Sequence, residues 1–212
     1  GGRYAYNMQP KIAHWNLYCL GQALLPLMEM EQAEAALQKF EAAFDTAYTT
    51  LMRAKLGLRI SAETDAKLAE RLLGLMQTSR ADFTIFFRSL SLFDSSAGAV
   101  NEKLRDQFTV REDFDAWASD YRVRLLHEGS VDAERRDRMD LANPAYVLRN
   151  WMAEEAIARW RDARDCAWVD ELRVLLSDPF PSPPGLVRSP GSPPRRAGSR
   201  SGPASSQHPD SP

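Results

Sequence analysis

The sequence predicts an all-α fold, and three observations support that prediction. From Pro10 to about Ser177, apolar residues recur at spacings of three and four, and no convincing stretch alternates with period two. The hydrophobic fraction of 44% and charged fraction of 26% are ordinary for a globular protein. From residue 178 onward the composition changes abruptly to proline, serine and arginine. We therefore predict a helical domain over residues 1–177 and a disordered tail over residues 178–212.

The first two helices have clear boundaries. The first opens at Pro10, because a proline in the first turn lacks an N–H that would be unpaired there anyway, and Pro26 limits its length. Its apolar stripe comprises Ala13, Leu17, Leu20, Leu24 and Leu27. Gly57 is placed to end the second helix in a left-handed conformation. The stripe of the second helix consists of Ala33, Leu37, Phe40, Phe44, Ala47 and Leu51.

Two shorter helices follow, each after a residue that can cap it. Ser61 or Thr64 precedes the third helix, and Asp82 precedes the fourth. Their apolar faces consist of Leu68, Leu72, Leu75 and Met76 in the third, and of Phe83, Phe86, Phe87 and Leu90 in the fourth. The small polar segment 95–98 is typical of a loop.

Four more helices are predicted downstream. One carries apolar residues from Phe114 to Leu125 and ends near Gly129, and a short charged helix runs from about Ser130 to Met139. The pair at 143–144 is Asn-Pro and marks the next boundary, since a residue before proline avoids the α region. The last two helices are defined by Val147, Leu148, Trp151, Met152 and Ala156, and by Val169, Leu172 and Leu176. We expect about seven or eight helices that share one core.

Composition argues against several classes of partner. The net charge of −2 gives no electrostatic footprint for nucleic acid, and no apolar stretch reaches the roughly 18 to 20 residues of a membrane helix. Cys19 and Cys166 have no disulfide-framework or zinc-site spacing, which favours a reducing compartment. The start lacks a signal peptide, and the absence of an initial Met indicates a truncated start. We expect no nucleic acid, no membrane, and a cytoplasmic location in a bacterial cell.

No catalytic motif stands out: the chain has no P-loop, G-x-G-x-x-G, H-E-x-x-H or G-x-S-x-G pattern. The histidines at 14, 127 and 208 form no recognisable ligand pair, and the frequent carboxylates are typical of solvated helix faces. Four polar residues lie within apolar segments, namely Asn16, Arg88, Arg149 and Asn150. A hydrogen-bonded structural network is the default interpretation of these four, and ligand contact is the alternative. The sequence therefore assigns no catalytic, cofactor-binding or metal-binding residue.

Four sequence blocks resemble the selenoprotein O (SelO/YdiU) family. The first is G-R-Y-x-Y-x-x-Q-P at 2–10, followed by W-N-L at 15–17 and L-x-P-L at 24–27. The second is D-F-T-x-x-F-R-x-L at 82–90, and the third is W-x-x-x-Y-x-x-R-L at 117–125. The most specific is M-x-x-x-N-P-x-Y-V-L-R-N-x-x-A at 139–153. Together the blocks cover roughly residues 2–180 in the family's order.

This resemblance implies a protein adenylyltransferase with a protein-kinase-like (pseudokinase) fold. Such proteins bind ATP with Mg²⁺ and transfer AMP to Ser, Thr or Tyr hydroxyls of proteins, a reaction called AMPylation. In the family, the nucleotide loop, phosphate-binding cations, proposed base and metal ligands all precede the G-R-Y block. The resemblance therefore implies the helical C-terminal lobe alone, an inactive fragment that holds neither ATP nor Mg²⁺ by itself. Its partners would be the missing N-terminal lobe and unknown protein substrates.

Two further expectations accompany this interpretation. Family members often end in a short cysteine or selenocysteine motif linked to redox control, whereas this chain ends in Asp-Ser-Pro, so the resemblance does not settle whether that regulation applies here. Related eukaryotic proteins are mitochondrial, which sets the location if the source is eukaryotic. The alternative function is a stand-alone helical protein-interaction module, which would bind through an exposed face or through the proline-rich tail docking on an SH3-like domain.

Overall fold

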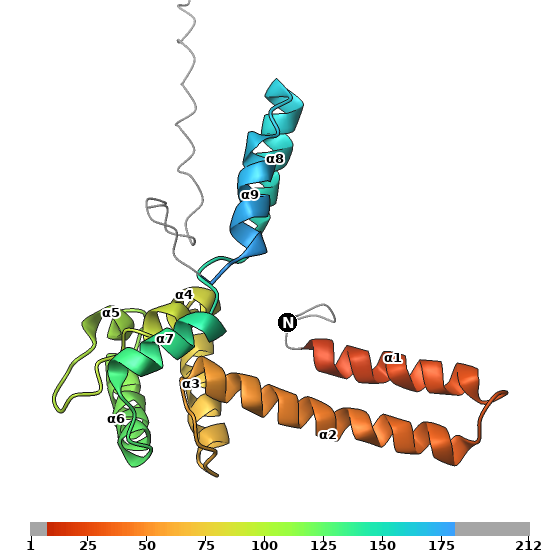
Figure 1. The fold of residues 1–212 in the computed structure, drawn as a ribbon, viewed down its shortest axis with the longest axis horizontal. Helices are drawn as coiled ribbons and strands as arrows, with labels where there is room; N and C mark the ends of the chain where they lie inside the picture. The colour runs from red at the N-terminus through yellow and green to blue at the C-terminus, as the bar shows by residue number, and fades with distance from the viewer. Residues whose placement is uncertain (1–7, 181–212) are drawn as a thin grey trace, which may run out of the picture.

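The structure, a computed structural model, describes residues 8–180, and the regular elements in that range are nine helices (Figure 1). The all-α prediction is confirmed there. The start of the first block, residues 2–7, and nearly all of the predicted disordered tail, from residue 181, lie outside the described residues. The helices are α1 (Gln9–Leu24), α2 (Met30–Lys55), α3 (Asp65–Ser79), α4 (Phe83–Leu90), α5 (Glu102–Arg105), α6 (Arg111–His127), α7 (Asp132–Ala142), α8 (Asn150–Ala163) and α9 (Ala167–Ser177).

One buried core joins the C-terminal end of α2 to α3, α4, α5, α6 and α7. Trp117 and Tyr121 of α6 lie at its centre, fully buried and one helical turn apart, with their rings stacked at 4.9 Å between centroids. Each buried polar tip has a partner, because the Trp117 indole donates to the Leu68 carbonyl (2.9 Å) and the Tyr121 hydroxyl to the Leu56 carbonyl (2.6 Å). Burial raises the pKa of Tyr121, so its hydroxyl stays a donor.

Two helical hairpins project from this core in different directions (Figure 1). In the first, α1 packs along α2, yet α1 has no buried residue and α2 has one, Met52, at the end that enters the core. In the second, α8 packs against α9, with Met152 and Leu172 as their buried residues. The expectation that all the helices share one core is therefore wrong. Helical periodicity finds an apolar stripe but does not say what the stripe packs against.

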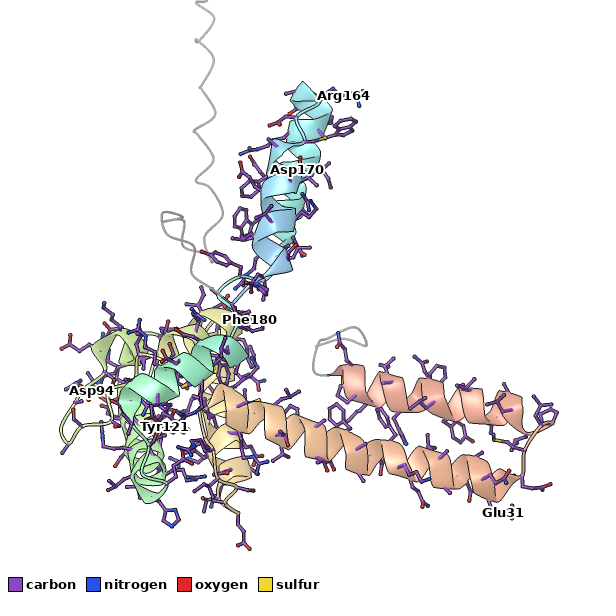
Figure 2. All side chains as sticks on the ribbon, viewed as in Figure 1. Glu31, Asp94, Tyr121, Arg164, Asp170 and Phe180 are labelled. Carbon is purple, nitrogen blue, oxygen red and sulfur yellow. The ribbon has the colours of Figure 1, made fainter. Side chains whose placement is uncertain are left out.

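The same correction applies to most of the first predicted stripe. Leu20 is 53% exposed and Leu27 is 83% exposed, and Trp15 on the same helix is 54% exposed. In Figure 2, Glu31 marks the far end of the first hairpin, well away from Tyr121 in the core. None of the described helices combines the length and apolar character that a membrane span requires.

Several helix boundaries differ from the prediction for local reasons. Val147 and Leu148 precede α8 instead of belonging to it, because the chain after Asn143 runs extended and the N–H groups of residues 145 and 146 donate to the Pro179 carbonyl (2.7 and 3.3 Å). Thr64 precedes α3, but its side chain makes no cap hydrogen bond there. The four-residue helix α5 has too few residues to show a period and was not predicted.

Gly57 ends α2 in the predicted left-handed conformation, with φ of 69°. The N–H of Gly57 donates to the Ala54 carbonyl, and the N–H of Leu58 donates to the Arg53 carbonyl (2.9 Å), the hydrogen-bond pattern of a Schellman motif. Space around the glycine is also restricted. A β-carbon at Gly57 would lie 2.5 Å from Cγ of Arg135 and 2.8 Å from Cγ of Met139. Gly57 is therefore required both by the backbone and by the close approach of α7.

We predict that Gly57→Ala destabilises the fold by about 2–4 kcal/mol, because it adds left-handed backbone strain to a steric clash with α7. The matched control is Gly98→Ala. Gly98 also has a positive φ, 82°, but no atom lies within 4 Å of the added carbon, so this variant should lose only about 1–2 kcal/mol of backbone energy. Urea unfolding followed by circular dichroism measures both, and equal losses would contradict the steric argument.

Candidate functional site

Polar residues of two sequence blocks meet where α4 begins and where the chain enters α8. Arg149 pairs with Asp82 through two hydrogen bonds, from Nη1 to Oδ2 (2.6 Å) and from Nη2 to Oδ1 (2.9 Å). Asp82 also caps α4 as predicted, since its Oδ1 accepts the N–H of Ile85 at 3.0 Å. One carboxylate thus serves as a helix cap and as the partner of a cation 67 residues away in sequence.

A second set of contacts joins α2, α4 and the end of α7 nearby. Arg88 donates through Nη1 to the carbonyls of Asp140 (2.8 Å) and Asn143 (3.0 Å), and it forms an ion pair with Asp140 at 3.3 Å. The fully buried Asn143 donates from Nδ2 to the carbonyl of Lys55 (3.0 Å) and accepts from Lys55 Nζ (3.3 Å). Lys55 Nζ lies 5.4 Å from the ring centroid of Phe83, and burial lowers its pKa. We call six residues of these two sets the polar junction: Lys55, Asp82, Arg88, Asp140, Asn143 and Arg149.

The polar junction shows which of the four polar residues within apolar segments belong to a structural network. Arg88 and Arg149 contact protein groups, as expected of a structural network. Asn16 and Asn150 do not join them, because both side chains are exposed, on α1 and at the start of α8. Sequence reasoning missed Lys55 and Asn143 as members. The signal for Asn143 was its place before Pro144, which had been interpreted only as a helix boundary.

A second buried ion cluster fixes the turn between α2 and α3. Arg124 donates from Nε to Asp65 (2.7 Å) and from Nη1 to Glu128 (3.0 Å), and it also contacts the Ile60 carbonyl. Burial opposes the charge of Arg124, but the hydrogen bonds to the two carboxylates outweigh it and raise its pKa. Asp65 also accepts the N–H of Ala62, which precedes α3. The cluster therefore holds the chain without offering a free charge.

The remaining titratable residues do not gather into a reactive group. His14 stacks on Phe40 and lies 3.6 Å from Glu41, His127 is exposed at the end of α6, and His208 is outside the described residues. Cys19 and Cys166 are both free and exposed. Within residues 8–180, no three His, Cys, Asp or Glu side chains come together as a metal site.

One groove of about 790 Å³ lies between α4, α7 and the segment after α9. Its walls include Leu92, Leu141 and Phe180, together with the paired Arg88 and Asp140. Figure 2 places Phe180 at the base of the second hairpin. The groove combines apolar surface with charges of both signs, two of them already paired, and so does not resemble a site built for one charged ligand.

Comparison with known proteins decides the family. Residues 1–177 match the family model described as "Protein adenylyltransferase SelO". The chain belongs to the SelO family. A relative from Myxococcus xanthus, "Protein nucleotidyltransferase YdiU", is 48% identical over 193 residues, which cover 91% of this chain and 39% of the relative. Proteins of the same name from Burkholderia cenocepacia and Burkholderia multivorans are 45% and 44% identical over 93% and 94% of this chain, and 41% of each relative is covered.

The chain thus spans about two fifths of the length of the curated relatives that it matches. Three of the four SelO-like blocks lie within the described residues, and they supply key members of the two ion networks and of the core. Arg88, Asn143 and Arg149 belong to the polar junction, Arg124 to the buried ion cluster, and Trp117 to the core. These five residues of the blocks hold helices together in this chain.

Asp82→Asn tests the polar junction without removing the cap, since Asn caps helices as well as Asp does. We expect a loss of about 1 kcal/mol near neutral pH from the missing ion pair with Arg149. The hydrogen bonds from Arg149 lower the pKa of Asp82, and the N–H of Ile85 adds to this against the opposing effect of burial. The native carboxylate is therefore fully stabilising above its unfolded pKa of about 3.9, and the stabilisation is lost as the pH falls through the lower folded value.

The measurement is urea unfolding of both proteins from pH 7 down to pH 2.5. The difference in unfolding free energy between wild type and Asp82→Asn should be constant above about pH 5 and shrink below about pH 4. Asp45→Asn is the control, because Asp45 is an exposed residue of α2. A difference that grows on acidification would contradict the assigned role of Asp82.

Proposed function

We propose that this chain is the helical C-terminal portion of a SelO-type protein adenylyltransferase, and that it acts as scaffold in a longer enzyme. The intact parent moves AMP from ATP, with Mg²⁺, to Ser, Thr or Tyr hydroxyls of proteins, and this portion corresponds to the helical lobe of a kinase-like fold. The observation that carries the proposal is the family match over residues 1–177 in a chain that covers only 39–41% of its relatives.

The side-chain chemistry of the described residues supports a scaffold role. Phosphoryl-type chemistry needs positioned cations and metal ions around the phosphates. Arg88 and Arg149, two cations of the family blocks, instead bind the carbonyls and carboxylate of neighbouring helices. The proposal therefore places ATP, Mg²⁺ and the catalytic residues in the upstream lobe, and it makes the isolated chain inactive. The bacterial relatives favour a cytoplasmic enzyme.

The second candidate function is an independent helical module that binds another protein. It is favoured by the exposed apolar residues of both hairpins, among them Trp15 at 54%, Ile157 at 62% and Trp160 at 47% exposure. Large exposed apolar surfaces mark interaction sites. The two candidates differ in the partner, which is the upstream lobe of the same enzyme in the first case and a separate protein in the second.

Calorimetric titration of MgATP into the chain tests the first candidate. We expect no saturable heat, because the cations of the polar junction are engaged and the nucleotide-binding residues lie upstream. The intact Myxococcus xanthus relative is the positive control and should bind. Saturable binding by the chain alone would overturn the scaffold proposal, and Arg88, Arg149 and Asn150 would then be the first residues to substitute.

Restoring the upstream portion tests the activity itself. We expect a chimera, made of the upstream part of the Myxococcus xanthus relative joined to this chain, to incorporate AMP from labelled ATP into protein. The chain alone should incorporate none. Incorporation by the chain alone would refute its inactivity, and a folded chimera without activity, beside an active relative, would count against a scaffold role in this reaction.

A further inference from the structure

Helix α1 has a composition that does not suit its surroundings. Of its sixteen residues, Lys11 is the only Lys, Arg, Asp or Glu, and no other position on its circumference carries one of these charged residues. Such helices lie inside proteins, because a helix that faces water keeps a charged or polar side. Yet α1 contains no buried residue. Its sequence therefore fits burial of more than one side, whereas α2 is the described element that packs along it.

The covered side is the one that packs on α2. His14 stacks on Phe40 with 5.9 Å between ring centroids, and a β-carbon on Gly21 would lie 3.8 Å from Cβ of Ala33. Farther along, Leu17 and Leu25 share a small cavity of about 140 Å³ with residues of α2. The two helices of this hairpin are thus in close contact, and the uncovered surface of α1 lies on its other side.

We define the α1 outer face as Ile12, Asn16, Cys19, Leu20 and Ala23. These residues recur at helical spacing, and all but the half-buried Ile12 are exposed. None is charged. The exposed residues of α2 in the same hairpin are different, since they include Glu34, Lys39, Glu41 and Asp45. The exposed surface of α2 therefore mixes these charges with apolar residues such as Tyr48 and Leu51, whereas the α1 outer face carries no charge.

We propose that the α1 outer face is an internal interface of the longer enzyme, covered by the upstream lobe that the proposed function assigns to it. This inference rests on the proposed function, because it takes the chain to be part of such an enzyme. Two observations select this occupant: 39–41% of the relatives is matched, so most of their chain is available to cover α1, and the face is uncharged, as permanent interfaces are.

Asn16 adds a specific requirement to this interface. Its side-chain amide lies among apolar neighbours on the α1 outer face, and an amide that becomes buried must be hydrogen-bonded. The upstream polypeptide must therefore present a donor and an acceptor opposite Asn16, within an otherwise apolar contact surface. This requirement distinguishes a specific interface from simple hydrophobic adhesion.

Alkylation of Cys19 measures coverage of the face directly, because Cys19 is free, exposed and central to it. Iodoacetamide is applied to the chain alone and to the Myxococcus xanthus chimera, and the modified peptides are quantified by mass spectrometry. We expect Cys19 to react readily in the chain alone and roughly tenfold or more slowly in the folded chimera. Leu20→Asp in the chimera, at a position that is 53% exposed in the chain, should restore the reactivity. The matched control Val123→Asp, at a position 64% exposed on α6, should leave Cys19 protected.

Equal reactivity of Cys19 in the chain and in a folded chimera would overturn the inference. So would a dimer of the chain alone, seen by sedimentation, in which Cys19 becomes protected as the concentration rises, because the occupant would then be a second copy. If the chimera does not fold, a cysteine is placed in the intact Myxococcus xanthus relative at the position aligned with Cys19. Protection of this cysteine from alkylation in the native protein would support the interface, and ready alkylation would refute it.

The readout does not depend on catalysis, so this test and that of the proposed function fail separately. A chimera with protected Cys19 and no AMP transfer supports the interface and counts against the activity. A chimera that transfers AMP while Cys19 stays reactive supports the activity and refutes the interface.

Discussion

The structure depends most on the burial of Trp117 and Tyr121 of α6 with their polar atoms satisfied. Through the carbonyls of Leu68 and Leu56, these two side chains bind α6 to α3 and to the end of α2. A buried indole or phenol without a partner costs roughly 1–3 kcal/mol, so the three helices can pack closely only in the register that provides both acceptors. The Schellman turn at Gly57 and the approach of α7 follow from that register, because Leu56 must end α2 at this point.

The positions of most helices were predictable from the sequence, whereas the packing of one helix against another was not. The 3.6-residue period located α3, α4 and α6 because each buries a stripe long enough to repeat, and it also located α2, although Met52 is the one buried residue of that helix. The same argument found α1 but placed it in a common core, since a stripe facing a single neighbour has the same period as one facing many. Val147 and Leu148 were assigned to a helix because periodicity cannot detect backbone bonds to a segment about 30 residues away, here the Pro179 carbonyl.

The sequence predicted that a structural network would form around Arg88 and Arg149, but not which residues would be their partners. Arg88 and Arg149 stood out because charged groups within apolar segments need partners, and a structural network was the expected outcome. Their partners were not evident, because Asp82 had a sufficient local role as a helix cap and Asn143 as a boundary before proline. A residue with one satisfactory local explanation gives no sign that it also has a distant role. Long-range pairs of this kind become visible only in three dimensions.

The attachment of the second hairpin has an evolutionary consequence. The chain leaves the core after residue 145 and returns at Pro179, and the N–H of Ala145 donates to the Pro179 carbonyl at 2.7 Å. Because entry and exit are neighbours, α8 and α9 form an insertion whose length can change at little entropic cost to the rest of the fold. Beyond Arg149, whose pairing with Asp82 ties the entry segment to α4, the hairpin can therefore be lengthened or shortened with little effect on the core.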